Sequence, residues 1–171
     1  MAYLADTNVL LRWIEPGTPL CEQAREAVKA LRSSGESVFI TPQNIVEFWN
    51  GATRPRSANG LGLTPAQADA EVRQIEALFP LAPETPAVYP QWRRLVLEAG
   101  VSGVQVHDAR LAAVMLAHSI SHLLTFNGRD FTRFSSTRLG SITVVHPAQV
   151  TGSLDPGSSP TASPSTESEI A

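Results

Sequence analysis

Short apolar runs alternate with helical patterns along the first 150 residues, and this alternation constrains the fold more than any other feature. A short apolar run between turn signals is typical of a buried strand, whereas apolar side chains at three- to four-residue spacing indicate a helix. Strands are expected at residues 3–5, 38–40, 122–125 and 142–145. Helices are expected over residues 20–32, from 42, from 65, over 87–98 and over 106–119. Strands separated by helices predict an α/β fold with a mainly parallel central sheet flanked by helices.

Two of these helices have explicit start signals. Thr41-Pro42 and Thr64-Pro65 each place a threonine at the N-cap and a proline at the first helical position. Between these two helices, residues 53–63 are rich in Gly, Asn, Pro and Arg and predict a loop. The helix over 106–119 is apolar nearly all round, so we expect it to be buried on most sides.

The composition changes near residue 151. From there to residue 171 the chain is rich in Ser, Thr, Pro and Gly and has almost no large apolar residue. Such a segment cannot bury enough surface to offset the entropy that it would lose on ordering. We therefore predict one folded domain over residues 1–150 and a disordered Ser/Thr/Pro-rich tail over 151–171.

Charge and targeting features limit the classes of function. The net charge of −3 is unfavourable for a protein that binds nucleic acid, but three of the 16 acidic residues and none of the 13 basic ones lie in the tail. The predicted domain is therefore neutral, and it would be positive if a metal ion neutralised several acids. The chain has a single cysteine, no signal-peptide pattern and no apolar run of the roughly 18 residues that a membrane span needs. These features predict a cytoplasmic protein with no membrane association.

Four acidic residues are candidates for one functional site: Asp6, Glu47, Asp108 and Asp130. Asp6 follows the first predicted strand, and open α/β sheets bind ligands at the carboxyl ends of their strands. Asp108 lies in the first turn of the buried helix, where an unpaired carboxylate needs a counter-charge. Carboxylate oxygens are ligands that suit Mg²⁺ or Mn²⁺.

Three of these acids also have a simpler interpretation when each is considered alone. Asp6 can equally be the N-cap of a helix that starts near Asn8. Glu47 lies on a polar helix face of the kind that any surface helix shows, and this interpretation is favoured on helix geometry. Asp130 follows an Asn-Gly turn signal and can be an ordinary turn residue.

Other catalytic signatures are absent from the sequence. There is no phosphate-binding glycine loop, no HExxH motif or Cys/His cluster for zinc, and no GxSxG nucleophile motif. Aspartate-based phosphatases and receiver domains depend on a late lysine, whereas the only lysine here is Lys29, on an early amphipathic helix.

Four motifs in series resemble the PIN domain, in particular the VapC-type toxin ribonucleases of type II toxin–antitoxin modules. They run in family-like order and spacing over about residues 1–150. The motifs are LADTNVLL at 4–11, TPQNIVEF at 41–48, HDARLAA at 107–113 and LLTFNGRDF at 123–131.

The resemblance implies a role for each matching residue. Asp6, Glu47 and Asp108 would be the main metal-site acids of a single PIN-like domain. Asp130 would be the fourth, in competition with Asn127, whose position carries an acid or an amide in relatives. Thr7 and Asn8 would orient Asp6.

The resemblance also implies an activity and partners. The family hydrolyses phosphodiester bonds of single-stranded or loop RNA with Mg²⁺ or Mn²⁺, and its members usually dimerise and are silenced by a small antitoxin. Arg129 and Arg133 lie near Asp130 in the sequence and are candidates for phosphate contacts. Two alternatives stay open: a non-toxin PIN nuclease in RNA processing, and a catalytically silent PIN-fold binding module.

Overall fold

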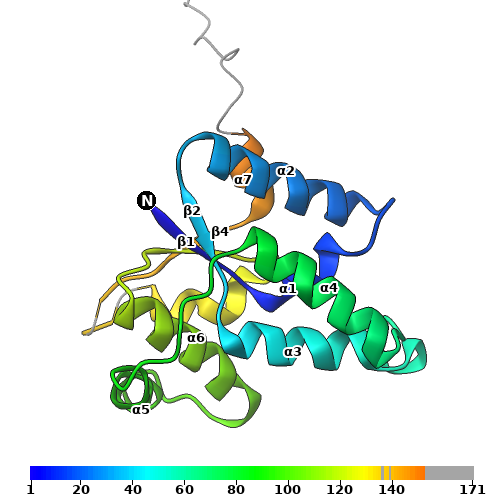
Figure 1. The fold of residues 1–171 in the computed structure, drawn as a ribbon. Coiled ribbons are helices and arrows are strands. Elements are labelled where there is room, and N and C mark those ends of the chain that lie inside the picture. The colour runs from blue at the N-terminus through cyan, green and yellow to red at the C-terminus, as the bar shows by residue number, and fades with distance from the viewer. Residues whose placement is uncertain (136, 139, 153–171) are drawn as a thin grey trace, which may run out of the picture.

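The computed structural model describes residues 1–135, 137–138 and 140–152, and it confirms the expected α/β fold with a parallel central sheet. The strands lie in the order β2-β1-β3-β4, and every neighbouring pair is parallel (Figure 1). Their bounds are β1 Ala2–Ala5, β2 Ser37–Phe39, β3 His122–Leu124 and β4 Thr143–Val145. Leu4 of β1 is in register with Phe39 on one side and with Leu123 on the other.

Helices connect the strands and cover both faces of the sheet (Figure 1). The α-helices are α1 Thr7–Trp13, α2 Pro19–Ser33, α3 Pro42–Thr53, α4 Pro65–Leu78, α5 Val88–Glu98, α6 Val106–Ala117 and α7 Pro147–Gly152. Three 3-10 helices add to them, η1 Arg56–Ala58, η2 Gly103–Gln105 and η3 Gly128–Phe134.

Two hydrophobic cores lie on opposite faces of the sheet, because successive side chains of a strand point to opposite faces. Tyr3 and Ala5 of β1 belong to a core with α1, α2, α3 and α4. Leu4, between them, belongs to the other core, which α5, α6 and η3 cover. The helix predicted to be buried on most sides is α6, whose residues 111–115 are all buried.

The topology brings several chain segments to one edge of the sheet. Parallel strands have their carboxyl ends at the same edge, so the residues that follow β1, β2 and β3 meet there. Helix α3 starts at this edge because it directly follows the segment after β2. Helix α6 precedes β3, so its first turn points to the same edge while its last turn leads back to the start of β3.

Some boundaries differ from those expected. Ile40 lies outside β2 and forms an isolated bridge with Leu81. The segment around Asp130 is the 3-10 helix η3 rather than a simple turn. Helix α7 was not predicted; it packs against α2 and continues past residue 150 to Gly152 (Figure 1). The rest of the predicted tail, 153–171, lies outside the described residues. Among the described residues, no helix combines the length and the apolar character needed to cross a membrane.

Candidate metal centre

Asp6 lies at the carboxyl end of β1, and three donors bind its carboxylate. Its side chain is 8% exposed. Oδ1 accepts from the backbone N–H of Thr7 at 2.6 Å, while Oδ2 accepts from Asn8 Nδ2 and from Thr125 Oγ1, both at 2.7 Å. Asp6 is the N-cap of α1, but one oxygen is turned toward the end of β3, which capping alone does not require.

Asn8 and Thr125 join the ends of β1 and β3. Asn8 Nδ2 also donates to Thr125 Oγ1 at 2.9 Å, and Asn8 Oδ1 accepts from the Phe126 N–H at 3.1 Å. Thr125 is fully buried. Sequence reasoning did not single out Thr125 as a functional residue. The register could have done so, because Ala5 pairs with Leu124, so Asp6 and Thr125 take equivalent places after neighbouring strands.

Glu47 comes from the second turn of α3 and is held by two donors. Thr7 Oγ1 donates to its Oε2 and Gln43 Nε2 donates to its Oε1, both at 2.7 Å. Asn44 Nδ2 in turn donates to Thr7 Oγ1 at 3.1 Å. The polar face of α3 therefore faces the end of β1 and is not a solvent face. Gln43 and Asn44 are buried, and sequence analysis had placed them on this face without assigning them a role.

The start of α3 is fixed by its cap. Thr41 and Asn44 form a reciprocal capping box in which the Asn44 side-chain oxygen accepts from both the Thr41 N–H and its hydroxyl at 2.8 Å. This leaves the Asn44 amide nitrogen pointing at Thr7. The capping box that starts α3 thus also positions the Thr7 hydroxyl, which donates to Glu47.

Asp108 is half-buried in the first turn of α6. Within the described residues it has no hydrogen bond and no ion pair. Its neighbour His107 has a backbone carbonyl that accepts from Gln43 Nε2 at 2.9 Å, which ties the start of α6 to α3. Gln43 therefore contacts both Glu47 and the segment that carries Asp108.

Asp130 lies in the first turn of η3 and accepts a hydrogen bond from Asn127 Nδ2. The Asn127 N–H donates to Thr125 Oγ1 at 3.0 Å, so the segment 125–130 folds back onto the end of β3. Asp130 and Asn127 are thus hydrogen-bonded to each other, and either side chain could supply an oxygen ligand to a metal ion on this side of the site.

Electrostatics show that the four acids are close enough to affect one another. Burial raises the pKa of Asp6 to about 6, against the hydrogen bonds from Thr125 and Thr7, and the charges of Glu47 and Asp130 raise it further. Burial also raises the pKa of Asp108 to about 6, with added repulsion from Asp6, Asp130 and Glu47 and a smaller opposing effect of His107.

Among the described residues, no basic side chain forms an ion pair with any of these four acids. The ion pairs of the described residues are made by other acids, and none involves Asp6, Glu47, Asp108 or Asp130. Four like charges around a half-buried site are costly without a counter-charge, and a divalent cation is the counter-charge that an all-oxygen set suits.

The side-chain conformations themselves do not form a coordination sphere. In the described part of the chain, no group of three or more His, Cys, Asp or Glu side chains is arranged so that it could hold a metal ion. Asp6 and Glu47 instead direct their oxygens to hydrogen-bond donors, and Asp130 bonds to Asn127. Carboxylate oxygens are ligands that fit Mg²⁺ or Mn²⁺. The four acids lie close enough for their charges to interact, but their oxygens are not arranged around one point.

Three arginines lie near these segments. Arg129 and Arg133 are exposed on η3, on either side of Asp130 in sequence, and Arg133 Nη1 donates to Gln105 Oε1 at 2.8 Å. Arg110, which sequence analysis did not single out, donates from Nη1 to Gln43 Oε1 at 3.0 Å and from Nη2 to Glu84 Oε2 at 2.9 Å. Arg110 therefore contacts the glutamine that holds Glu47.

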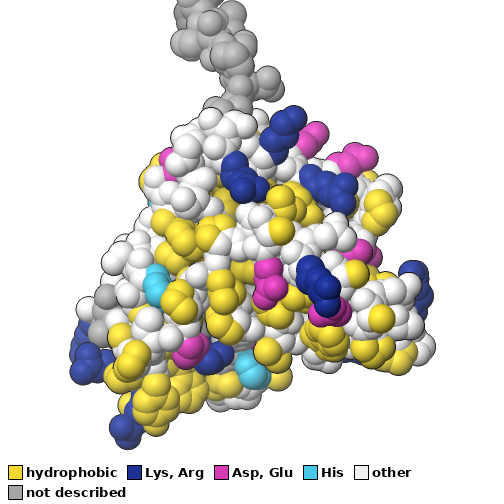
Figure 2. Space-filling model, in the orientation of Figure 1, with side chains coloured by type: hydrophobic (Ala, Val, Ile, Leu, Met, Phe, Trp, Pro, Cys, Tyr) yellow, Lys and Arg dark blue, Asp and Glu magenta, His cyan; other side chains and the backbone are white. Residues whose placement is uncertain are grey.

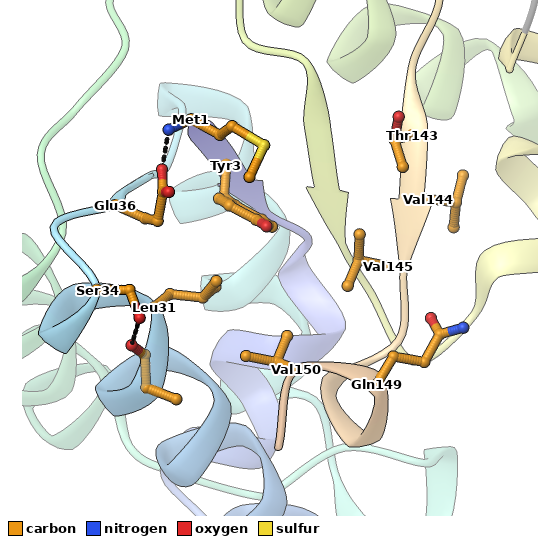
Figure 3. A pocket seen from close by; sticks show the side chains of 11 residues that line it. Met1, Tyr3, Leu31, Ser34, Glu36, Thr143, Val144, Val145, Gln149 and Val150 are labelled. Carbon is orange, nitrogen blue, oxygen red and sulfur yellow. Dashed lines mark hydrogen bonds and ion pairs between the residues drawn. The ribbon is translucent and has the colours of Figure 1, made fainter. Parts of the chain in front are cut away.

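A cavity of about 390 Å³ lies away from this group, between α2, β1, β4 and α7 (Figure 3). Its lining is mainly apolar, with the ion pair between the Met1 amino group and Glu36 at its rim. None of the predicted site residues lines this cavity, so it is separate from the carboxylate site.

Comparison with known proteins decides the family. Residues 3–136 match the family model described as PIN domain. The chain belongs to the PIN domain family. No curated protein matches it significantly.

Solved structures share the fold of this PIN domain at low sequence identity. One is VapBC2 from Rickettsia felis bound to a DNA fragment from its promoter, with 14% identity and a TM-score of 0.63 over 85% of this chain and 98% of that chain. Another is DNA-bound VapBC from Salmonella typhimurium, with 17% identity and a TM-score of 0.64 over 86% and 98%. A third is VapC20 from Mycobacterium tuberculosis, described as a sarcin–ricin loop cleaving toxin, with 16% identity and a TM-score of 0.54 over 75% and 92%.

Proposed function

We propose that this PIN domain is a Mg²⁺- or Mn²⁺-dependent endoribonuclease that cleaves single-stranded or loop RNA. The observation that carries the proposal is the convergence of Asp6, Glu47, Asp108 and Asp130 at one sheet edge, with mutual repulsion and no basic partner in the described chain. The similarity of the fold to a toxin described as cleaving the sarcin–ricin loop supports RNA as the substrate class.

The four acids would divide the work. Asp6 and Asp108 would hold the metal ion, and Glu47 and Asp130, or Asn127 in place of Asp130, would complete its shell directly or through water. When bound, the ion supplies a nucleophilic water at neutral pH and stabilises charge that develops on the phosphate. Thr7, Asn8 and Thr125 donate hydrogen bonds that hold the Asp6 carboxylate in place while the charge on the phosphate develops.

Cleavage would proceed by in-line attack of water on the scissile phosphorus, with departure of one ribose oxygen. Glu47, held from both sides by Thr7 and Gln43, or Asp130 in its place, would orient this water and take its proton, which then passes to the departing ribose oxygen. Arg129 and Arg133 would contact a phosphate from η3, where both side chains are exposed, and Arg133 would exchange its bond to Gln105 for the phosphate. The RNA must be unpaired, since a recessed site does not reach bases within an A-form helix.

The test is cleavage of a single-stranded RNA by purified protein with added Mg²⁺ or Mn²⁺. Asp6→Asn and Asp108→Asn are expected to lower the rate by at least about 100-fold, since such changes remove metal ligands or their charge. Glu76→Gln, an exposed acid on α4, is the matched control and should cleave as the wild type does. Cleavage by both aspartate variants at the wild-type rate would refute the assignment.

The alternative is a catalytically silent binding module, which a measurement of metal binding distinguishes from a nuclease. Calorimetric titration with Mn²⁺ measures metal binding independently of cleavage. Absence of Mn²⁺ binding by the wild type would favour a silent module, whereas binding that Asp6→Asn and Asp108→Asn abolish supports the metal centre.

We further propose that the protein is the toxin of a toxin–antitoxin pair and acts on RNA in the cytoplasm. The similar folds of the VapBC proteins support this role and a small antitoxin as partner. Expression of the wild type, but not of Asp108→Asn, is expected to arrest growth, and co-expression of an antitoxin encoded beside it should relieve the arrest. A nuclease of RNA processing would leave growth unchanged.

A homodimer is the proposed assembly. Val46 on α3 and Leu78 on α4 are 70% and 36% exposed, although the opposite faces of both helices lie in the core. Light scattering at micromolar concentration should give twice the monomer mass, and a monomeric mass would contradict the proposal.

A further inference from the structure

A hollow beside the carboxylate site is lined by an unusual combination of aromatic, apolar and charged groups. The α5 hollow, as we call it, has a volume of about 280 Å³ and is lined by Glu84, Val88, Tyr89, Trp92 and Arg110. None of the four acids lines it, so it is a separate feature of the surface.

The aromatic side of the α5 hollow is formed by an exposed tyrosine beside a half-buried tryptophan. Tyr89 is 65% exposed, so its ring is open to a planar ligand. Its ring lies 6.0 Å from that of Trp92, with an interplanar angle of 30°. Trp92 is fixed from behind, because its Nε1 donates to the backbone carbonyl of Val106 at 2.9 Å. The two rings therefore present a stacking surface that needs little ordering when a planar group binds.

The polar side of the α5 hollow is connected to the carboxylate site. Arg110 lines the hollow, and its Nη1 donates to Gln43, which in turn donates to Glu47. Val106, to which Trp92 bonds, is two residues before Asp108 in α6. The hollow and the four acids thus lie on either side of Gln43 and of the first turn of α6.

Charge around the α5 hollow suits a phosphate-bearing ligand. Arg93 and Arg94 lie on the same helix and, with Tyr89 and Pro90, border a neighbouring hollow of about 310 Å³. Both arginines are exposed and, in the described chain, neither makes an ion pair. Figure 2 shows hydrophobic and basic side chains exposed next to each other over α5. Aromatic stacking surfaces next to arginines are typical of sites that bind unpaired RNA.

We propose that the α5 hollow binds one unpaired base of the RNA substrate, stacked on Tyr89, near the phosphate that is hydrolysed at the four acids. This proposal takes its substrate class from the proposed function. The base would enter between Tyr89 and Arg110, while Arg93 and Arg94 contact the backbone on the other side of Tyr89. Only an unstacked base can occupy such a hollow, so the site would select single-stranded or loop RNA.

The experiment compares Tyr89→Ala, Tyr89→Phe and Leu20→Ala in RNA binding and cleavage. Binding is measured by fluorescence anisotropy with a single-stranded oligonucleotide and Mg²⁺, in an Asp108→Asn background that prevents turnover. Tyr89→Ala is expected to weaken binding roughly 5- to 150-fold, the range for loss of one stacked base, and to raise KM while kcat changes little. Tyr89→Phe keeps the ring and should bind as the wild type does.

Leu20→Ala is the control, because Leu20 on α2 is 40% exposed and lines neither the α5 hollow nor the neighbouring hollow beside Arg93 and Arg94. Its binding and KM should be unchanged. An abasic nucleotide scanned along the RNA should weaken wild-type binding at one position near the cut, and the Tyr89→Ala variant should not show this loss.

The outcomes separate the two proposals. Wild-type cleavage with the same KM and binding for Tyr89→Ala would overturn the base-binding role and leave the nuclease intact. RNA binding that depends on Tyr89 without any cleavage would refute the nuclease and support the α5 hollow. Loss of binding to a protein partner, with RNA binding unchanged in Tyr89→Ala, would overturn the proposal in favour of a protein-docking surface.

Discussion

Asp6 and Asp108 have pKa values raised to about the same level in different surroundings. Asp6 accepts three hydrogen bonds, which favour its charged form, yet its burial outweighs them. Asp108 is less buried but, within the described residues, has no hydrogen-bond donor and faces three other acids. A bound cation would therefore stabilise the charged form of both carboxylates and lower their pKa values.

These pKa values predict a pH dependence of stability. A carboxyl whose pKa is raised from 3.8 to about 6 on folding stabilises the native state below about pH 4, and this contribution is lost as the pH rises through 6. In EDTA, the free energy of unfolding should therefore fall over this range, by about 2 to 3 kcal/mol from Asp6. Urea unfolding at several pH values measures it.

Asp6→Asn should remove the part of this fall that comes from Asp6, because the amide does not ionise. Asp69→Asn, which changes an exposed acid paired with Arg73 on α4, is the control and should keep the wild-type profile. An unchanged profile in Asp6→Asn would contradict the assigned pKa.

The hydrogen bond from Thr125 to Asp6 leads to a second prediction at the scale of single residues, on the pH dependence of cleavage. Its hydroxyl donates to Asp6 and lowers the Asp6 pKa, so Thr125→Val should raise it further. A hydrogen bond to a charged group is worth about 1.5–3 kcal/mol, or roughly one to two pH units. The acid limb of the pH–rate profile for RNA cleavage should move to higher pH by this amount. Thr143→Val, an exposed change in β4, should leave the limb unchanged; movement in both variants would point to a general loss of structure.

At the scale of elements, the site is built from the starts of helices. Helices α1, α3 and α6 all begin at the carboxyl edge of the sheet and supply Asp6, Glu47 and Asp108 from the cap or the first turns. Three helix N-termini also direct their dipoles at this edge, which favours the charged form of the acids and would favour a bound phosphate.

Two capping boxes allow a matched test of this arrangement. Thr41 caps α3 and Thr64 caps α4 with the same geometry, but only the Thr41 partner, Asn44, also binds Thr7. Thr41→Ala and Thr64→Ala should each lower the free energy of unfolding by about 0.5–2 kcal/mol, with the larger loss at buried Thr41.

Cleavage should distinguish the two variants. Thr41→Ala is expected to lower kcat, because Asn44, Thr7 and Glu47 lose their common support, whereas Thr64→Ala should keep the wild-type kcat. Equal kcat values for both variants, measured well below their melting temperatures, would show that the cap of α3 does not position Glu47.

At the scale of the whole molecule, one sheet with two cores accounts for the stability of the described chain. Every core residue assigned to the two clusters lies between Tyr3 and Ile142, and α7 adds Val150 at the periphery. Basic side chains lie in separate groups over α2, near the end of α3 and around α5 on the face seen in Figure 2, without one continuous patch. Affinity for RNA should therefore depend on a bound cation as well as on these arginines.

Truncation after Gly152 tests the predicted domain boundary. Removal of residues 153–171 should leave the urea midpoint and the RNA cleavage rate unchanged, because their composition lacks the apolar side chains that a core needs. A truncation into α7, after Pro147, is the contrasting variant and should lower the midpoint, because α7 packs on α2. A loss of stability in the first variant would show that the tail contributes to the fold.

Much of the fold was predictable because its signals are local. Periodicity predicted the order of strands and helices, and Thr-Pro pairs predicted the starts of α3 and α4. Helix α7 and the 3-10 helix η3 were missed, because they are short and depend on packing against α2 and α6 rather than on their own periodicity.

The sequence by itself determined that Asp6 and Asp130 follow strands, that Asp108 lies at a helix start and that Glu47 lies on a polar helix face, together with the likeness of these motifs to PIN domains. Only the tertiary structure decided that the polar face of α3 faces Asp6 and that Thr125 binds its carboxylate. It also showed that Gln43 joins Glu47 to Arg110 and the α5 hollow. Apart from the bond between Gln43 and Glu47 within α3, these contacts connect residues that are 37 to 119 positions apart in sequence, and no local pattern reports such a contact. Which face of a helix is buried, and against what, is a property of the packed chain, because burial is decided by the neighbouring elements.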